Sequence, residues 1–154
     1  MSQRLEQFGL EVAEDKTHII EFSPCKVRVK TKFDFLGFEF RWGVNRWGKP
    51  ILKRRTSREK LQVSLAKFKV WFKKYSGIPK KILFMKLNRK LQGYYNYYGI
   101  RGNYKSLNSF VYRIWKLLYK WLNRRSQRKS YTLEGFKALV KDFEIAKPRI
   151  CHDF

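Results

Sequence analysis

Cationic and aromatic side chains recur at helical spacing between residues 87 and 125, a stretch that contains no aspartate or glutamate. Ammonium and guanidinium groups neutralise phosphates, and tyrosine rings beside them can stack on unpaired bases. These residue types therefore predict a surface that binds a polyanion, with nucleic acid as the first candidate and an anionic membrane as the second. The alternative is that the lysines only solvate the surface. Solvating surfaces usually mix both signs of charge, however, and Glu59 is the only acidic residue between positions 57 and 130.

The formal net charge of +24 is concentrated in the middle of the 154-residue chain. Residues 1–56 contain 12 basic (Lys, Arg) and 7 acidic (Asp, Glu) residues. Residues 57–130 contain 20 basic and 1 acidic residue, and residues 131–154 contain 4 of each. We therefore divide the chain into an N-terminal β region, a basic helical region, and a C-terminal helix with a tail. Hydrophobic content of 44% is enough for a folded core in spite of the charge.

Three helices are predicted for the basic region, because apolar residues repeat there every three or four positions. They cover residues 57–75, 79–98 and 107–123, and residues 99–103 form a Gly/Asn hinge. Each helix has one apolar stripe, and burying these stripes against one another makes a small antiparallel bundle. The stripes consist of Leu61, Leu65, Phe68 and Phe72; of Leu83, Phe84, Leu87, Leu91, Tyr94, Tyr95 and Tyr98; and of Phe110, Ile114, Leu117, Leu118, Trp121 and Leu122.

Helix-start signals flank this bundle. Thr56 and Glu59 have the spacing of a capping box, in which Thr56 caps the first helix. Thr132 can cap a final short helix, whose apolar face would be Phe136, Leu139, Val140 and Phe143. The tail over residues 145–154 could pair as a strand or remain unpaired.

The N-terminal region has strand patterns. Two short strands are predicted over residues 10–12 and 17–22, and residues 27–32 alternate apolar and basic side chains. The aromatic, β-prone run 33–42 is followed by a reversal and a returning segment over 50–54, which completes a hairpin. The fold class is therefore α+β: a small N-terminal β-hairpin region, a three-helix antiparallel bundle and a short C-terminal helix.

Several classes of protein are excluded by what the sequence lacks. No apolar run has the length of a membrane span and the N-terminus has no signal pattern, so we expect a cytoplasmic protein that does not contact a membrane. Cys25 and Cys151 have no CxxC partner or paired histidines, so neither a metal site nor a disulfide framework is predicted.

Three parts of the basic region form one pattern: LNRKLQGYYNYY at residues 87–98, Phe110, and WKLLYKWLNRR at residues 115–125. This pattern resembles the maturase-specific domain of bacterial group II intron reverse transcriptases. The resemblance covers about residues 57–140 and is specific, because Gly, Asn and Trp recur at several fixed offsets. Upstream, Gly9-Leu10 with Lys16-Thr17 resembles the late palm motif of these polymerases, and Phe33-Asp-Phe-Leu-Gly-Phe38 resembles their primer-grip hairpin.

The resemblance implies that the two regions of the chain correspond to different parts of a reverse transcriptase. Residues 1–56 would be the remnant of a palm with a primer-grip-like hairpin, and residues 57–130 would be the thumb and maturase-specific domain. Phe35, Leu36, Gly37 and Phe38 match the primer grip, although a merely packed hairpin is the alternative. Lys16 matches the late-palm lysine, which acts near the leaving pyrophosphate in an intact polymerase, although a solvated lysine at a strand start is equally consistent with the sequence.

No catalytic residue and no cofactor are assigned to this chain. The full-length family enzyme is an RNA-directed DNA polymerase whose adjacent aspartates hold two Mg²⁺ ions. This sequence has no adjacent aspartates, so we expect no activity from the chain alone. Residues 3–8 look like the last turn of a helix ended by Gly9, which suggests the back part of a longer architecture or a shortened reading frame.

We expect the first of three functions, and the other two are its alternatives. The first is an RNA-binding maturase and thumb module that binds structured group II intron RNA, assists splicing and, in the full protein, contacts the template–primer duplex. The second is the C-terminal part of a polymerase that is active only with a separately supplied fingers and palm polypeptide. The third is a remnant without function.

The predicted RNA-binding set lies on the polar sides of the second and third helices. Arg89 and Arg124 rank first, because a guanidinium can both fork onto phosphate and stack on a base. Tyr94, Tyr98, Trp115 and Trp121 are assigned to the core, because they fall on or beside the apolar stripes. The full set is Lys86, Arg89, Lys90, Asn96, Arg113, Lys116, Lys120, Arg124 and Arg125.

Overall fold

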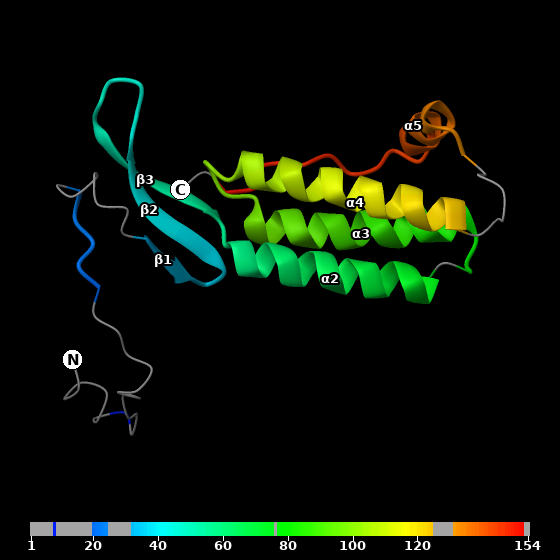
Figure 1. Ribbon diagram of the computed structural model, residues 1–154, viewed down its shortest axis with the longest axis horizontal. Helices are drawn as coiled ribbons and strands as arrows, with labels where there is room; N and C mark the ends of the chain where they lie inside the picture. The colour runs from blue at the N-terminus through cyan, green and yellow to red at the C-terminus, as the bar shows by residue number, and fades with distance from the viewer. Residues whose placement is uncertain (1–7, 9–19, 25–31, 76, 125–130, 153–154) are drawn as a thin grey trace.

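A small antiparallel sheet stands at one end of a bundle of three long helices, and a fourth helix lies at the other end (Figure 1). The computed structural model describes residues 8, 20–24, 32–75, 77–124 and 131–152. The predicted α+β fold class is confirmed. The elements in chain order are β1 (Lys32–Phe35), β2 (Phe38–Val44), β3 (Pro50–Thr56), α2 (Arg58–Tyr75), α3 (Lys80–Tyr98), α4 (Tyr104–Arg124) and α5 (Leu133–Asp142).

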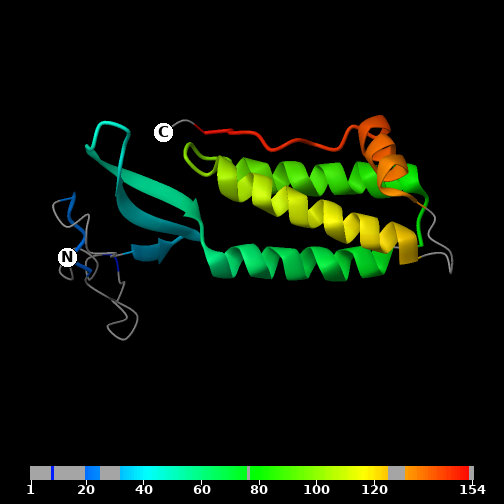
Figure 2. The ribbon, with the colours of Figure 1, turned by 45° about the horizontal axis from the view of Figure 1, so that its top comes forward.

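The sheet has the order β1-β2-β3, and its first turn divides the aromatic run 33–42. Leu36 and Gly37 form this turn with φ angles of 49° and 81°, between the paired residues Phe35 and Phe38. Two consecutive positive φ angles are typical of the tight hairpin turn that matches strand twist. The run is therefore two strands, and its turn points toward the start of α2 (Figure 2).

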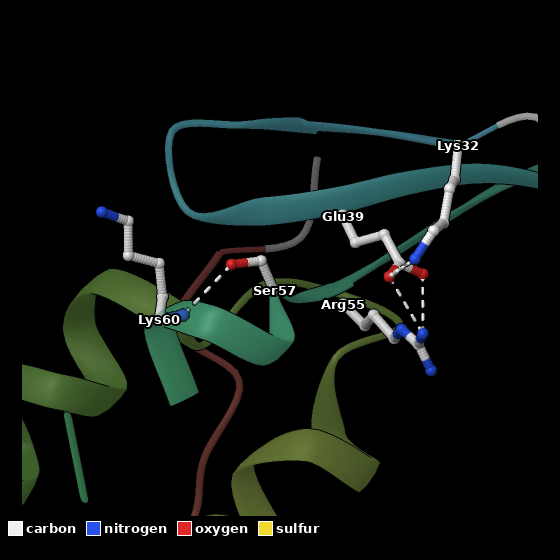
Figure 3. A network of polar contacts seen from close by, with 5 residues as sticks. All are labelled: Lys32, Glu39, Arg55, Ser57 and Lys60. Atoms are coloured by element: carbon white, nitrogen blue, oxygen red, sulfur yellow. Dashed lines mark hydrogen bonds and ion pairs between the residues drawn. The ribbon is translucent and has the colours of Figure 1, made fainter. Parts of the chain in front are cut away.

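Glu39 is the one acidic side chain buried in the described part of the sheet, with 2% of its surface exposed. Its carboxylate oxygens lie 2.8 Å from Arg55 Nη2 and 3.2 Å from Lys32 Nζ (Figure 3). Burial acts to raise the pKa of Glu39, but the hydrogen bonds and charges of Arg55 and Lys32 outweigh it and hold the pKa below its usual range. Strands β1, β2 and β3 are thus joined through one carboxylate.

We expect Glu39→Gln to lower the free energy of unfolding by about 1–2 kcal/mol at neutral pH. The effect is modest because the side chains of Lys32 and Arg55 are exposed to solvent, which screens their charges. A folded-state pKa below the unfolded value of about 4.5 means that the ion pairs stabilise the protein above that pH. Their contribution is lost as the pH falls through the folded pKa. Urea unfolding at several pH values should therefore show the difference shrinking in acid.

The control for this measurement is Asp34→Asn, which neutralises an exposed carboxylate on the neighbouring strand. A stability difference for Glu39→Gln that stayed constant from pH 7 to pH 3 would show that the ion pairs contribute nothing.

The three apolar stripes pack on one another, as the periodicity predicts. α2, α3 and α4 lie side by side in both views (Figures 1 and 2) and share one core. At its centre the rings of Tyr94 and Phe110 stack with centroids 3.7 Å apart, and Phe68 meets Phe110 edge to face. Tyr94 is buried, while Tyr98, Trp115 and Trp121 are half-buried against the core. The antiparallel bundle is confirmed.

Asn103, which is fully buried, joins the sheet to the bundle. Its side-chain amide donates to Thr56 Oγ1 and to the Tyr98 carbonyl, both at 2.8 Å, and its oxygen accepts from the Thr56 amide at 2.8 Å. Its backbone carbonyl accepts from the amides of Ser106 and Leu107, so α4 begins at Tyr104 and not at 107 as the periodicity predicted. The end of β3, the end of α3 and the start of α4 therefore meet at one residue.

The predicted cap of the first helix is wrong by one residue. Thr56 is the last residue of β3, where it is paired with Phe38 and held by Asn103, so it cannot serve as the cap. The Ser57 hydroxyl instead accepts from the Lys60 amide at 3.3 Å (Figure 3). Thr132 caps α5 as predicted, accepting from the Gly135 amide at 3.1 Å.

The segment after α5 runs back along the bundle toward the sheet (Figure 2). The Tyr95 hydroxyl donates to the Ala146 carbonyl at 2.9 Å, and burial raises its pKa, so it remains a donor. Near its end the segment forms a parallel bridge between His152 and Ile100. The described part of the tail is therefore neither loose nor a strand: it is held by hydrogen bonds to α3 and by this single bridge.

The predicted strand over residues 17–22 is wrong in its described part, because residues 20–22 adopt no strand. Phe22 is held by its side chain instead, with its ring 4.8 Å from that of Phe33 and 5.4 Å from that of Trp42. The predicted helical turn 3–8 (but for residue 8), the strand 10–12, nearly all of the segment 27–32, Lys16, Cys25 and Arg125 lie outside the described residues. Within the described residues no helix combines the length and the apolar character needed to cross a membrane.

Candidate nucleic-acid interface

The outward face of α4 carries four of the predicted cations. Its inward stripe is held in the core by residues such as Ile114 and Leu118, which are fully buried, so the opposite side of the helix faces outward. Helical spacing places the four cations on neighbouring turns of that side. We call this surface the α4 face; it consists of Arg113, Lys116, Lys120 and Arg124, all exposed.

Aromatic rings accompany the cations of the α4 face. Lys116 Nζ lies 4.6 Å from the ring centroid of Tyr112, and the Arg124 guanidinium lies 5.0 Å from that of Trp121. Tyr112 is 59% exposed, so its ring is available to an outside partner. Cations and rings in alternation can bind phosphates and bases together.

The α3 members of the predicted set lie elsewhere. Lys86 Nζ is 4.8 Å from the ring of Tyr75, and Lys90 Nζ is 4.9 Å from that of Phe68, so both lysines lie against α2. Arg89 is exposed. The structure therefore divides the described cations of the predicted set into the α4 face, the pair Lys86 and Lys90 between α3 and α2, and the exposed Arg89 of α3.

Asn96 holds the C-terminal segment. Its side-chain oxygen accepts from Arg149 Nη2 at 3.2 Å, and its backbone carbonyl lies 2.8 Å from His152 Nε2. These contacts span more than fifty residues, so the polar spacing along α3 gave no signal of them. Asn96 is less available to RNA than the sequence suggests.

The described cations of the predicted RNA-binding set have no carboxylate beside them in the described part of the chain. α3 and α4 contain no aspartate or glutamate, and among the described residues no carboxylate lies within ion-pair distance of these seven cations. No described carboxylate therefore neutralises their charges, which can attract an external anion.

The hairpin turn borders a pocket of about 530 Å³ where β1, α2 and α3 meet. Of the four hairpin residues, Phe35 and Leu36 are exposed, while Gly37 and Phe38 pack against α3. A Cβ on Gly37 would lie 3.1 Å from the Tyr98 hydroxyl, which explains why glycine is needed at this approach. The Tyr97 hydroxyl donates to the Leu36 carbonyl at 2.8 Å and fixes the turn.

The described residues do not fit the two-magnesium site of the full-length polymerases. No group of three His, Cys, Asp or Glu side chains comes together among them. Asp34 lies in β1 and Asp142 at the end of α5, at opposite ends of the bundle (Figure 1). We derive no metal-dependent step for these residues.

Fold and surface together define an α+β module in which a three-helix bundle presents a cationic and aromatic helix face. Residues 61–138, just over half of the chain, match the family model of the group II intron maturase-specific domain. The chain belongs to this family, which supports a maturase module involved in group II intron splicing. No curated protein and no solved structure matched the chain.

The match extends from α2 into α5 and agrees with the resemblance found over residues 57–140. The resemblance of the upstream motifs to a reverse transcriptase palm and primer grip stays a prediction, because the matched residues begin after the sheet.

Proposed function

We propose that the protein binds structured group II intron RNA through the α4 face and thereby assists the intron in reaching its splicing-competent fold. The observation that carries the proposal is the row of four exposed cations on a helix without a single acidic residue. Membership of the maturase family indicates that group II intron RNA is the partner.

Binding of this kind is physical and requires no covalent step. Each cation that meets a phosphate releases condensed counterions, which drives association at low salt. Arg113 and Arg124 can each fork onto a phosphate, whereas Lys116 and Lys120 act as point charges. Tyr112 adds an exposed ring for a base that is not paired. A folded RNA offers both kinds of partner close together.

Affinity for intron RNA should fall steeply with salt. If the four cations of the α4 face and the four other cations of the predicted set each neutralise one phosphate, the logarithm of the association constant should decrease against the logarithm of salt concentration with a slope of roughly −6 to −7. Filter binding between about 50 and 200 mM monovalent salt measures this slope.

An unrelated structured RNA of equal length is the control for that titration, and it should show a similar slope with lower affinity. A nearly flat salt dependence for the intron RNA would exclude the α4 face as the means of binding.

In a complete polymerase the same module would also contact the template–primer duplex. The supporting observation is that the hairpin turn at Leu36 and Gly37 is fixed beside α3 while Phe35 and Leu36 stay exposed. Primer extension with separately supplied fingers and palm, compared with the chain alone, tests this second role.

A further inference from the structure

A groove of about 1250 Å³ runs between the first half of α4, α5 and residues 144–148. We call it the α4–α5 groove. Figures 1 and 2 show α5 at the end of the bundle, on the side away from α2, and the segment after it running back along the bundle. Its volume exceeds the range of about 300–1,000 Å³ that is typical of small-molecule pockets, so it suits an extended ligand.

The floor and walls of the groove are apolar and aromatic. Val111, Val140 and Ile145 line it and are buried, so the floor is part of the core. Tyr104 and Tyr112 line it with 51% and 59% of their surfaces exposed, which leaves their rings free to stack on a flat ligand.

Trp115 adds a third ring to the lining of the α4–α5 groove, and this side chain is half-buried. Nucleobases have the flat faces that stack on aromatic rings of this kind.

The rim of the groove is cationic although the segment 131–154 has no net charge. Lys105 of α4, Lys137 and Lys141 of α5, and Lys147 of the following segment line it and are exposed. Glu144 is the only acidic residue in its described lining. Lysines from three elements therefore surround one apolar concavity, which is complementary to bases flanked by phosphates.

We infer that the α4–α5 groove binds an unpaired stretch of RNA, with bases stacked on Tyr104, Tyr112 and Trp115 and phosphates against Lys137, Lys141 and Lys147. The inference deepens the proposed function and rests on it. A duplex hides its bases between its strands and would leave the rings of the groove without partners. The α4 face would then bind the structured part of the RNA, while the groove captures a loop or bulge.

The test uses the full chain and two RNA probes: an unpaired octamer that contains 2-aminopurine, and an RNA duplex of eight base pairs. Tyr104→Leu keeps the apolar contact but removes a stacking ring that belongs to the groove alone, and Tyr112→Leu is a second variant, whose ring also lies beside Lys116 of the α4 face. Each should weaken octamer binding about 5- to 30-fold, which corresponds to the loss of one stacked base, and should change duplex binding less than twofold. The fluorescence of 2-aminopurine should be quenched by the original protein and much less by the variants.

The lysines of the rim are tested with Lys137→Gln/Lys141→Gln, matched by Lys67→Gln/Lys69→Gln on α2. The groove pair should lose at least tenfold more octamer affinity than the α2 pair, with thermal unfolding unchanged in both. The groove would be excluded as an RNA site if the two lysine pairs lost equal affinity, or if both tyrosine variants bound the octamer as well as the original protein. The proposed function would survive either result, provided that structured RNA still bound with a steep salt dependence. Failure of the original protein to bind either structured RNA or the octamer would instead overturn the proposed function itself.

Discussion

Replacing Asn103 with alanine is expected to lower the free energy of unfolding by about 3–5 kcal/mol. The side chain makes three hydrogen bonds of 2.8 Å in a fully buried position. Alanine would leave the Thr56 amide without a partner, which costs about 1–3 kcal/mol. It would also remove the hydrogen bonds to the Thr56 hydroxyl and to the Tyr98 carbonyl, each worth about 0.5–1.5 kcal/mol, although the carbonyl would still accept from the Ile100 amide. Urea unfolding followed by circular dichroism measures the change.

Two further substitutions sharpen this prediction. Asn108→Ala removes the same side chain from an exposed position of α4 and should cost less than about 0.5 kcal/mol. Asn103→Asp keeps the acceptor for the Thr56 amide but removes the amide donors and buries a carboxylate against the Tyr98 carbonyl, so at neutral pH it should destabilise the protein at least as much as Asn103→Ala. If Asn103→Ala were as mild as Asn108→Ala, the sheet and the bundle would have to be joined by other contacts.

The helices of this protein were predictable because their information is local. The spacing of Leu87, Leu91 and Tyr95 fixes the buried side of α3, and Thr132 marks the start of α5 one residue before it begins. Asn103 was not predictable, because its partner Thr56 lies 47 residues away. The same contact explains the misplaced cap, since a threonine used by the sheet cannot also cap the helix.

The interface was only partly predictable for a related reason. Sequence periodicity separates the cationic side of a helix from its apolar side, but it does not say which neighbouring helix covers the margin. Lys86 and Lys116 are equivalent in the sequence, yet the first lies over a ring of α2 and the second over a ring of its own helix. Lys137, Lys141 and Lys147 of the groove were missed altogether, because they come from a segment without net charge and meet Lys105 only when α5 packs against the bundle.

Reversing three charges of the α4 face should weaken the binding of structured intron RNA at least 100-fold at about 0.1 M salt. The variant carries Lys116→Glu, Lys120→Glu and Arg124→Glu together. Each phosphate contact changes the logarithm of affinity by about 0.7–0.9 for each tenfold change in salt. Three contacts therefore contribute about 2 to 2.7 logarithmic units between about 1 M and 0.1 M salt, and repulsion adds to the loss. The salt slope should become shallower by about 2 to 3.

The matched control carries the same change of charge at Lys49, Lys67 and Lys81, which are exposed on the β2–β3 turn, α2 and α3. It should lose less than tenfold in affinity. Because glutamate near the end of α4 opposes the helix dipole, the neutral variant Lys116→Gln/Lys120→Gln/Arg124→Gln separates loss of contact from loss of helix. It should keep the original helicity by circular dichroism and still bind at least about 30-fold more weakly. Equal losses in the α4 and control variants would mean that the RNA responds to net charge alone, because a binding face must depend on where its cations lie.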